Sequence, residues 1–347
     1  MPKLFITGST GYIGGDALYV ITKTFPDLEI TAVVRNSAKG AKVASQYPNV
    51  RLVYGDLDSI DLLTEEASKA DVVVHTANCD HVASAEALLK GLGQKEGKSW
   101  LIHTSGTGML SFADFDRKSY GQRSEKVYDD WDGIKEVTSI PDHAAHRNVD
   151  KIILGASDQY PGKVSTAIVC PPCIWGPGRG PDNKKSMQVY RMASATLKRG
   201  KGFHVEEGKN RWTEIHVQDL SDVYAALVNA ALEGGGKATW NDEGYYFTEN
   251  GDIVWEDIAK GIAKAAFDKG LIKTVDVENV SPEEAEKLSS FGSYLWGMNS
   301  RCRAYRARKL LGWNPKQPKV ESVLPTIVEG EAKELGLIKG HAEQAAG

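Results

Sequence analysis

The first half of the chain alternates short runs of aliphatic and β-branched residues with segments of helical periodicity. Six such runs are KLFITG, EITAVVR, VRLVYGD, DVVVHTA, SWLIHTSG and VSTAIVCP. Runs that are apolar throughout are typical of strands buried on both faces, and helices between them supply the crossovers that parallel strands need. The pattern predicts an α/β lobe with a doubly wound parallel sheet over residues 1–175.

The pattern changes after Trp175, where a loop rich in Gly and Pro precedes a helix and then a strand–helix pair. We expect residues 176–212 and 249–335 to form a smaller C-terminal substrate lobe. Residues 213–248 should return to the first lobe, and residues 336–347 should form a tail. The long crossing over residues 106–141 is interpreted either as a mobile lid or as a structured surface insertion.

Composition excludes several classes of protein. The formal net charge of −4 offers no basic surface for nucleic acid or an anionic membrane. No apolar run approaches a membrane span, no signal peptide opens the chain, and four cysteines are too few for a disulfide framework, so we expect a cytoplasmic protein. Cys170 and Cys173 have redox spacing, but they end an apolar run and are expected to be buried; no metal site is predicted.

The stretch FITGSTGYIGG places Gly8, Gly11 and Gly14 directly after the first predicted strand and before a predicted helix. Glycines at this place allow a tight turn and let backbone N–H groups approach a pyrophosphate at the positive end of a helix. The motif predicts a Rossmann-type dinucleotide site formed by the loop, with Thr10, Tyr12 and Ile13 among its residues.

Arg35 lies at the end of the second predicted strand, where an NAD enzyme usually carries Asp or Glu for the ribose 2′-hydroxyl. A guanidinium suits a 2′-phosphate, and Ser37 and Lys39 follow nearby. We therefore expect NADP(H) to be preferred, with NAD(H) as the alternative. An exposed arginine without any cofactor role is the structural alternative.

Taken in order, TGSTGYIGG, GDL, HTA, HTSGT, PPCIWGPG, HVQDL and RARKLLGWNP resemble landmarks of the extended short-chain dehydrogenase/reductase family, which includes NAD(P)-dependent epimerases and dehydratases. The resemblance covers almost the whole chain. It implies a catalytic serine at Ser105 and cofactor contacts from Asp56, Leu57, Ala77, Asn78, Thr104, His146 and Pro172.

The family carries Tyr-x-x-x-Lys on the helix after that serine, and here the resemblance places Asp142 and His146 at those two positions. The stretch from Ser139 to Gly155 begins with a proline turn and then predicts a helix that carries both residues, so we expect their side chains to share a face. The pair is interpreted either as a catalytic carboxylate and imidazole or as a helix cap, in which Asp142 accepts a bond from a free backbone N–H. Asp142 buried beside a neutral His146 is a further possibility.

Loss of the phenol favours substrates that accept hydride with little help from an acid. We expect an NADPH-dependent reductase of a small carbonyl, imine, iminium or conjugated substrate with an atypical site. The alternatives are a non-catalytic NADP-binding sensor and an epimerase or dehydratase. The expected partner is a small molecule, and a homodimer is left open.

Overall fold

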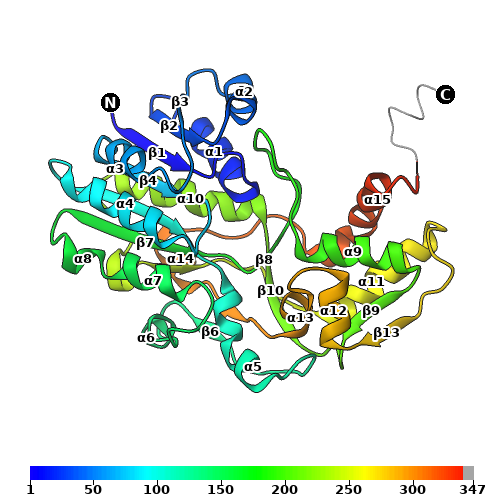
Figure 1. The fold of residues 1–347 in the computed structure, drawn as a ribbon. Coiled ribbons are helices and arrows are strands. Elements are labelled where there is room, and N and C mark those ends of the chain that lie inside the picture. Colours follow the sequence, from blue (N-terminus) through cyan, green and yellow to red (C-terminus); the bar gives the residue numbers. More distant parts are fainter. Residues whose placement is uncertain (339–347) are drawn as a thin grey trace.

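A computed structural model describes residues 1–338, and its centre is a seven-stranded parallel sheet in the order β11-β7-β5-β4-β1-β2-β3 (Figure 1). This sheet confirms the predicted doubly wound α/β lobe. Its six predicted strands form where the apolar runs lie, and a seventh returns from later in the chain. The strands are β1 (Lys3–Thr7), β2 (Glu29–Val34), β3 (Arg51–Tyr54), β4 (Val72–His75), β5 (Ser99–Thr104), β7 (Val164–Cys170) and β11 (Tyr245–Phe247).

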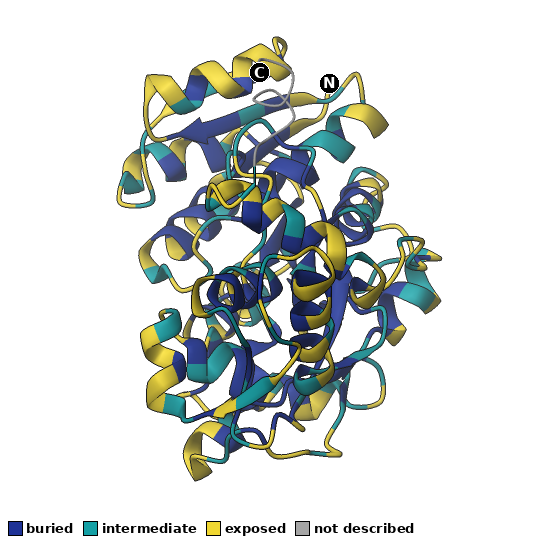
Figure 2. Cartoon of the chain, turned by 90° about the vertical axis from the view of Figure 1, so that its right-hand side faces the viewer, coloured by how far each residue is buried: buried dark blue, intermediate teal, exposed yellow. Residues whose placement is uncertain are grey.

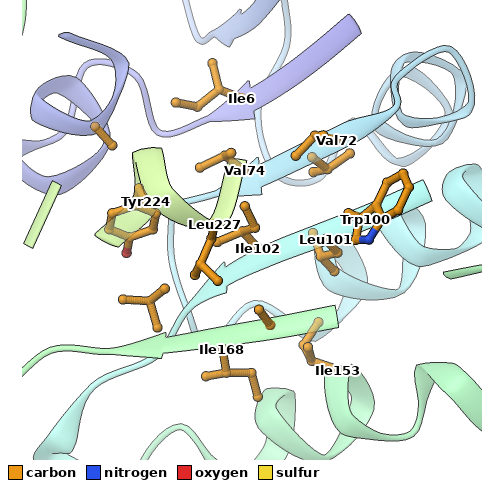
Figure 3. Packing of buried hydrophobic residues seen from close by; sticks show 14 of the residues in the cluster. Ile6, Val72, Val74, Trp100, Leu101, Ile102, Ile153, Ile168, Tyr224 and Leu227 are labelled. Atoms are coloured by element: carbon orange, nitrogen blue, oxygen red, sulfur yellow. The ribbon is translucent and has the colours of Figure 1, made fainter. Parts of the chain in front are cut away.

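Helices cover both faces of the sheet. On one face α1 (Tyr12–Thr24) packs against α10 (Val217–Leu232), and on the other α4 (Val82–Gln94) packs against α3 (Ile60–Ser68) and α7 (Arg147–Leu154). Two further helices of this lobe are α2 (Ser37–Gln46) and α8 (Ala156–Gln159). Figure 3 shows Tyr224 and Leu227 of α10 lying over strand residues such as Ile102. All three are fully buried.

The second lobe has its own core. Trp255 and Trp296 are among its fully buried side chains. The pattern of buried inner and exposed outer faces is visible in Figure 2. The lobe contains α9 (Gln188–Arg199), β9 (Gly202–Val205), α11 (Trp255–Asp268), β13 (Val277–Val280), α12 (Pro282–Leu288), α13 (Gly292–Gly297), the 3₁₀ turn η3 (Val320–Val323) and α15 (Leu324–Glu334).

A three-stranded sheet joins the lobes, in the order β12 (Asp252–Val254), β10 (Arg211–His216) and β8 (Cys173–Trp175). Both α10 and β11 pack in the core of the first lobe, with the 3₁₀ turn η2 (Asn241–Glu243) between them. The segment 302–313 also packs there, through Cys302 and Trp313 among others, although the sequence placed it in the substrate lobe. The reason is β14 (Cys302–Arg303), which pairs with β6 (Tyr128–Asp129), and α14 (Tyr305–Leu311), which packs near α10 and β11.

The crossing over residues 106–141 is a structured insertion. It holds the 3₁₀ turn η1 (Thr107–Ser111), α5 (Phe112–Arg117), β6 (Tyr128–Asp129) and α6 (Ile134–Thr138). The Asp114 carboxylate accepts hydrogen bonds from Asn299 N and Nδ2, both at 2.8 Å. Asp130 accepts bonds from Phe247 N and Arg306 N, both at 2.9 Å. These bonds favour the second of the two sequence interpretations over an open lid.

Among residues 1–338, no helix is long and apolar enough to cross a membrane. Of the predicted tail, residues 339–347 lie outside the described residues.

Candidate active site

The glycine loop runs tightly against the end of β4. Gly8 has a φ of +78°, a left-handed conformation that glycine adopts without strain, and a β-carbon there would lie 2.6 Å from the backbone oxygen of Thr76. At Gly14 a β-carbon would lie 2.1 Å from Thr76 Oγ1. Gly11 N donates to Gly8 O at 2.8 Å and closes the turn. The loop therefore needs glycine at these positions for packing as well as for access to a ligand.

A cleft of about 720 Å³ opens above this loop. It brings together eight of the predicted cofactor residues, namely Gly8, Thr10, Gly11, Arg35, Asp56, Leu57, Ala77 and Asn78. Thr76, His81 and Asn183 also line it, without having been predicted. A second hollow of about 280 Å³ is lined by the predicted Tyr12, Ile13 and Pro172, and it shares Thr76 and Asn183 with the first. Together the two hollows give an elongated site that leads from Arg35 to Pro172.

Residues 176–187, here called the strap, connect β8 to α9 and pass across the glycine loop. Arg179 forms a two-bond ion pair with the buried Asp16 of α1, at 3.0 and 2.7 Å. Asp182 pairs with both Lys39 and Lys42 of α2. Asn183 N donates to Thr10 O at 3.2 Å. The strap is therefore tied to the loop and to the helix that follows Arg35.

His146 stands at the entrance to α7 in a left-handed conformation, with a φ of +65°. Its Nδ1 lies 2.8 Å from an Asp80 carboxylate oxygen and 3.3 Å from Cys79 Sγ. Burial opposes the charged imidazole, but the hydrogen bonds to Asp80 and Cys79 prevail and raise the pKa of His146 to about 10. His146 is therefore a cation at neutral pH, in contrast to the alternative of a neutral imidazole beside a buried Asp142.

The ligand atoms of Cys79, Asp80 and His146 lie within 4.8 Å of one another, close enough to hold one metal ion. The sequence did not predict this group, since Cys79 and Asp80 follow β4 and His146 begins a helix almost seventy residues later. With Nδ1 of His146 hydrogen-bonded to both neighbours, the three side chains also satisfy one another without a cation.

The prediction that Asp142 and His146 share a helical face is wrong, because α7 begins only at Arg147. Residues 141–146 form turns, which the Arg147 guanidinium holds by donating to the backbone oxygens of Ile140 and Thr138. The Asp142 side chain is 74% exposed and accepts a bond from Lys151 Nζ at 2.7 Å. It neither caps α7 nor lies buried beside His146, and the structure does not bring it to the cleft.

The carboxylate that contacts Ser105 belongs to Asp150 and not to Asp142. Ser105 Oγ and Tyr245 OH each donate to the same oxygen of Asp150, both at 2.9 Å. Asp150 is fully buried in the first turn of α7, four residues after His146. Burial raises the pKa of Asp150 to about 6, although the two hydroxyl donors work in the opposite direction. The carboxylate–imidazole spacing that was sought at 142 and 146 thus occurs at 146 and 150.

Thr104 is another predicted residue that lines neither hollow, as are Gly14, Ser105 and His146. It is buried, and its hydroxyl lies 2.6 Å from the hydroxyl of Tyr224 on α10. Cys170 and Cys173 are buried as expected, and burial raises the pKa of both thiols. Neither thiol is therefore a ready nucleophile.

The substrate lobe reaches the site through Tyr294 of α13. A β-carbon on Gly108 would lie only 2.3 Å from the Tyr294 hydroxyl oxygen. The hydroxyl therefore packs on the turn just after Ser105. The hydroxyl has no hydrogen-bond partner in the described part of the chain. Burial raises its pKa, and Asp80 adds to the effect. An unpaired phenol from one lobe therefore faces the serine turn of the other.

Solved proteins with this architecture include an epimerase and dehydratases. A UDP-glucose 4-epimerase from Thermotoga maritima, solved with UDP-glucose, superposes with a TM-score of 0.64 over 96% of this chain and 99% of its own at 15% identity. A dTDP-glucose 4,6-dehydratase from Streptomyces venezuelae, solved with NAD, gives 0.66 over 97% and 99% at 17% identity. No family model matches the chain.

Curated relatives give the sequence counterpart. The oxidase ucsJ of an Acremonium species is 37% identical over 344 residues, which cover 96% of this chain and 99% of that protein. The uncharacterized protein YLL056C of Saccharomyces cerevisiae is 24% identical over 326 residues, 91% of this chain and 95% of its own. The chain belongs to the extended short-chain dehydrogenase/reductase family. As a member of this family of oxidoreductases, epimerases and dehydratases, it is an enzyme.

Several structural neighbours in this family were solved with NAD bound, which supports a nicotinamide dinucleotide as the cofactor class. The residues present fit such a group, because the glycine loop and Arg35 line the cleft and Pro172 lines the adjacent hollow, which shares Thr76 and Asn183 with it. The two positions that the sequence resemblance assigns to the family's tyrosine and lysine hold Asp142 and His146.

Proposed function

We propose that the enzyme reduces a small organic substrate with NADPH at a carbonyl, an imine or iminium, or a conjugated double bond. The observation that carries the proposal is the dinucleotide-shaped cleft combined with a cation, His146, that is held by Asp80 close to the serine turn. The cofactor would supply hydride, and the chain would bind, orient and shield the reactants.

The chemistry of the individual residues supports this assignment. Backbone N–H groups of Thr10 and of the first turn of α1, at Tyr12 and Ile13, would hold the pyrophosphate. The charged imidazole of His146 would take the part of the family's lysine, which is also a cation, and would stabilise negative charge that develops on the substrate. Asp142 has no part in this scheme, because its side chain points to solvent and is paired with Lys151.

The name of the curated relative, an oxidase, raises the reverse reaction as a second candidate. The epimerases and dehydratases among the structural neighbours favour a third, in which the dinucleotide is used transiently. To separate them, purified protein is incubated with NADPH and imines, enones, aldehydes and nucleotide sugars, and in parallel with NADP⁺ and the reduced compounds. Product analysis without net cofactor change would identify an epimerase or dehydratase.

The first testable prediction concerns the choice of cofactor. Lys39 is already paired with Asp182, so the preference for NADP(H) should rest mainly on the exposed Arg35, which lines the cleft. We expect Arg35→Ala to weaken NADP(H) binding by about tenfold or more, since a charge-assisted hydrogen bond contributes about 1.5–3 kcal/mol, and to leave NAD(H) binding nearly unchanged. Calorimetry with both cofactors measures this.

Arg123→Ala is the matched control, because Arg123 is exposed and pairs with Glu125 on the insertion, away from the cleft. It should alter neither affinity. Equal affinity of the unmodified enzyme for NADP(H) and NAD(H), unaffected by Arg35→Ala, would refute the preference.

A further inference from the structure

Buried polar groups without partners gather behind Ser105, at the carboxyl ends of the central strands. Asp150 uses one carboxylate oxygen for Ser105 and Tyr245, and its other oxygen has no hydrogen-bond partner among residues 1–338. Both ring nitrogens of His103 also lack one there, and Nε2 lies 3.9 Å from the free oxygen of Asp150. Unpaired buried polar atoms are costly, so a group of them calls for a functional explanation.

The group continues across the sheet. The ring of His75 lies 5.1 Å from that of His103, and its Nδ1 lies 2.6 Å from Thr7 Oγ1 at the start of the glycine loop. Burial lowers the pKa of His75 to about 4 and also lowers that of His103. Both imidazoles are therefore neutral at pH 7 and do not neutralise a charge on Asp150.

The surroundings of Asp150 make its proton exchangeable. The titratable or charged groups that act on it lie on β5, β7 and β11, at the residue before α7 and in its first turn; they are His103, Cys170, Tyr245, His146 and Arg147. Burial raises the pKa of Asp150, whereas the hydroxyl donors Tyr245 and Ser105 and then the two cations lower it, with a net value of about 6. A buried acid with such a value can both hold and release a proton under working conditions.

We propose that Asp150 is the proton store of this site and exchanges its proton with the substrate through the Ser105 hydroxyl. This inference rests on the proposed function. In the reducing direction, hydride from the cofactor would form the new C–H bond of the substrate. The Ser105 O–H bond breaks as its proton joins the substrate oxygen or nitrogen. The Asp150 O–H bond then breaks, and its proton restores the Ser105 hydroxyl. Solvent returns one proton to Asp150 through Ser105 after the product leaves.

In the oxidising direction the same protons move the other way, and the Asp150 carboxylate acts as the acceptor. Asp150 does not touch the substrate and so is a positioning residue for the proton. It replaces the phenol that the family places at position 142. Reduction should therefore slow as pH rises through about 6, while oxidation should accelerate over the same range.

The test uses pH profiles of turnover for the full-length enzyme and three variants. Asp150→Asn should lower turnover by about 10²–10⁴, with a smaller change in KM, and should remove the ionisation near pH 6. Ser105→Ala should lower turnover to a similar extent. Tyr245→Phe removes one donor to the carboxylate, so it should move the ionisation to higher pH and leave turnover below pH 6 largely intact.

Asp158→Asn on the surface of α8 is the control and should leave the profile unchanged. Infrared titration of the carboxylic acid band gives a readout that does not need turnover. The band should disappear near pH 6 in the unmodified enzyme and be missing in Asp150→Asn. In Tyr245→Phe it should disappear at a higher pH. A profile that Tyr245→Phe leaves in place, or moves to lower pH, would overturn the inference even if reduction is found. If no substrate reacts while the band behaves as expected, the proposed function is the part that fails.

Discussion

Replacing His146 with alanine is expected to lower turnover by about 10²–10³, the usual cost of removing one preorganised electrostatic donor. The imidazole is charged below its pKa of about 10, because its hydrogen bonds to Asp80 and Cys79 prevail over burial. Turnover of the unmodified enzyme should therefore fall as pH rises through about 10, and this fall should be missing in His146→Ala. Steady-state rates between pH 5 and 11, with cofactor affinity measured separately, test both points.

Two nearby replacements control this experiment. His143→Ala removes an exposed imidazole three residues earlier that pairs with Asp116, and it should leave turnover unchanged. Asp142→Ala should also have little effect, since this carboxylate only pairs with Lys151. A loss in Asp142→Ala as large as that in His146→Ala would show that the sequence interpretation of the pair was right and that the structure assigns the wrong carboxylate.

The second large effect is expected in the glycine loop. Gly8→Ala imposes a left-handed φ on alanine, which costs about 1–2 kcal/mol, and forces its methyl group against the backbone of Thr76, for which about 1–3 kcal/mol more is typical. The free energy of unfolding should fall by the sum. Cofactor affinity should fall by about tenfold or more, because the loop must move to relieve the contact and its N–H groups lose their alignment.

Gly97→Ala separates the two contributions. Gly97 has nearly the same φ, +83°, but a β-carbon there meets nothing within 4 Å. It should therefore lose only the conformational part and keep full cofactor affinity. Chemical denaturation of both variants, with calorimetry of cofactor binding, makes the comparison. Equal losses in both variants would mean that the contact with Thr76 has no role.

The sequence predicted those parts of the molecule that depend on local pattern. Apolar runs fixed the six early strands, and the glycine spacing led to Gly8 and its partners in the cleft. The start of α7 escaped prediction because the stretch after Pro141 has no feature that excludes a helix. The helix begins only at Arg147 because His146 adopts a left-handed conformation and because the Arg147 side chain bonds to the preceding turn. Both are properties of the folded chain.

The candidate site was harder to predict because its members come from distant segments. The sequence shows that Asp150 follows His146 at helical spacing, so this pair could have been predicted. The contact with Tyr245 could not, because Tyr245 reaches Asp150 from a strand almost one hundred residues later. Cys79 and Asp80 carry no motif of their own and gain meaning only beside His146. Strand order, which decides these meetings, is set by tertiary packing and not by any short stretch.

The strap bears on how long a bound dinucleotide would remain. Asp16, Lys39, Lys42 and the glycine loop all hold residues 179–183, and Asn183 lines the cleft, so we expect a bound cofactor to exchange slowly. Slow exchange favours a reaction cycle that restores the nicotinamide within one visit of the substrate, or paired substrates that reduce and oxidise it in turn. An enzyme built this way would be purified with its dinucleotide still attached, and the redox state of that nucleotide would record the last half-reaction it performed.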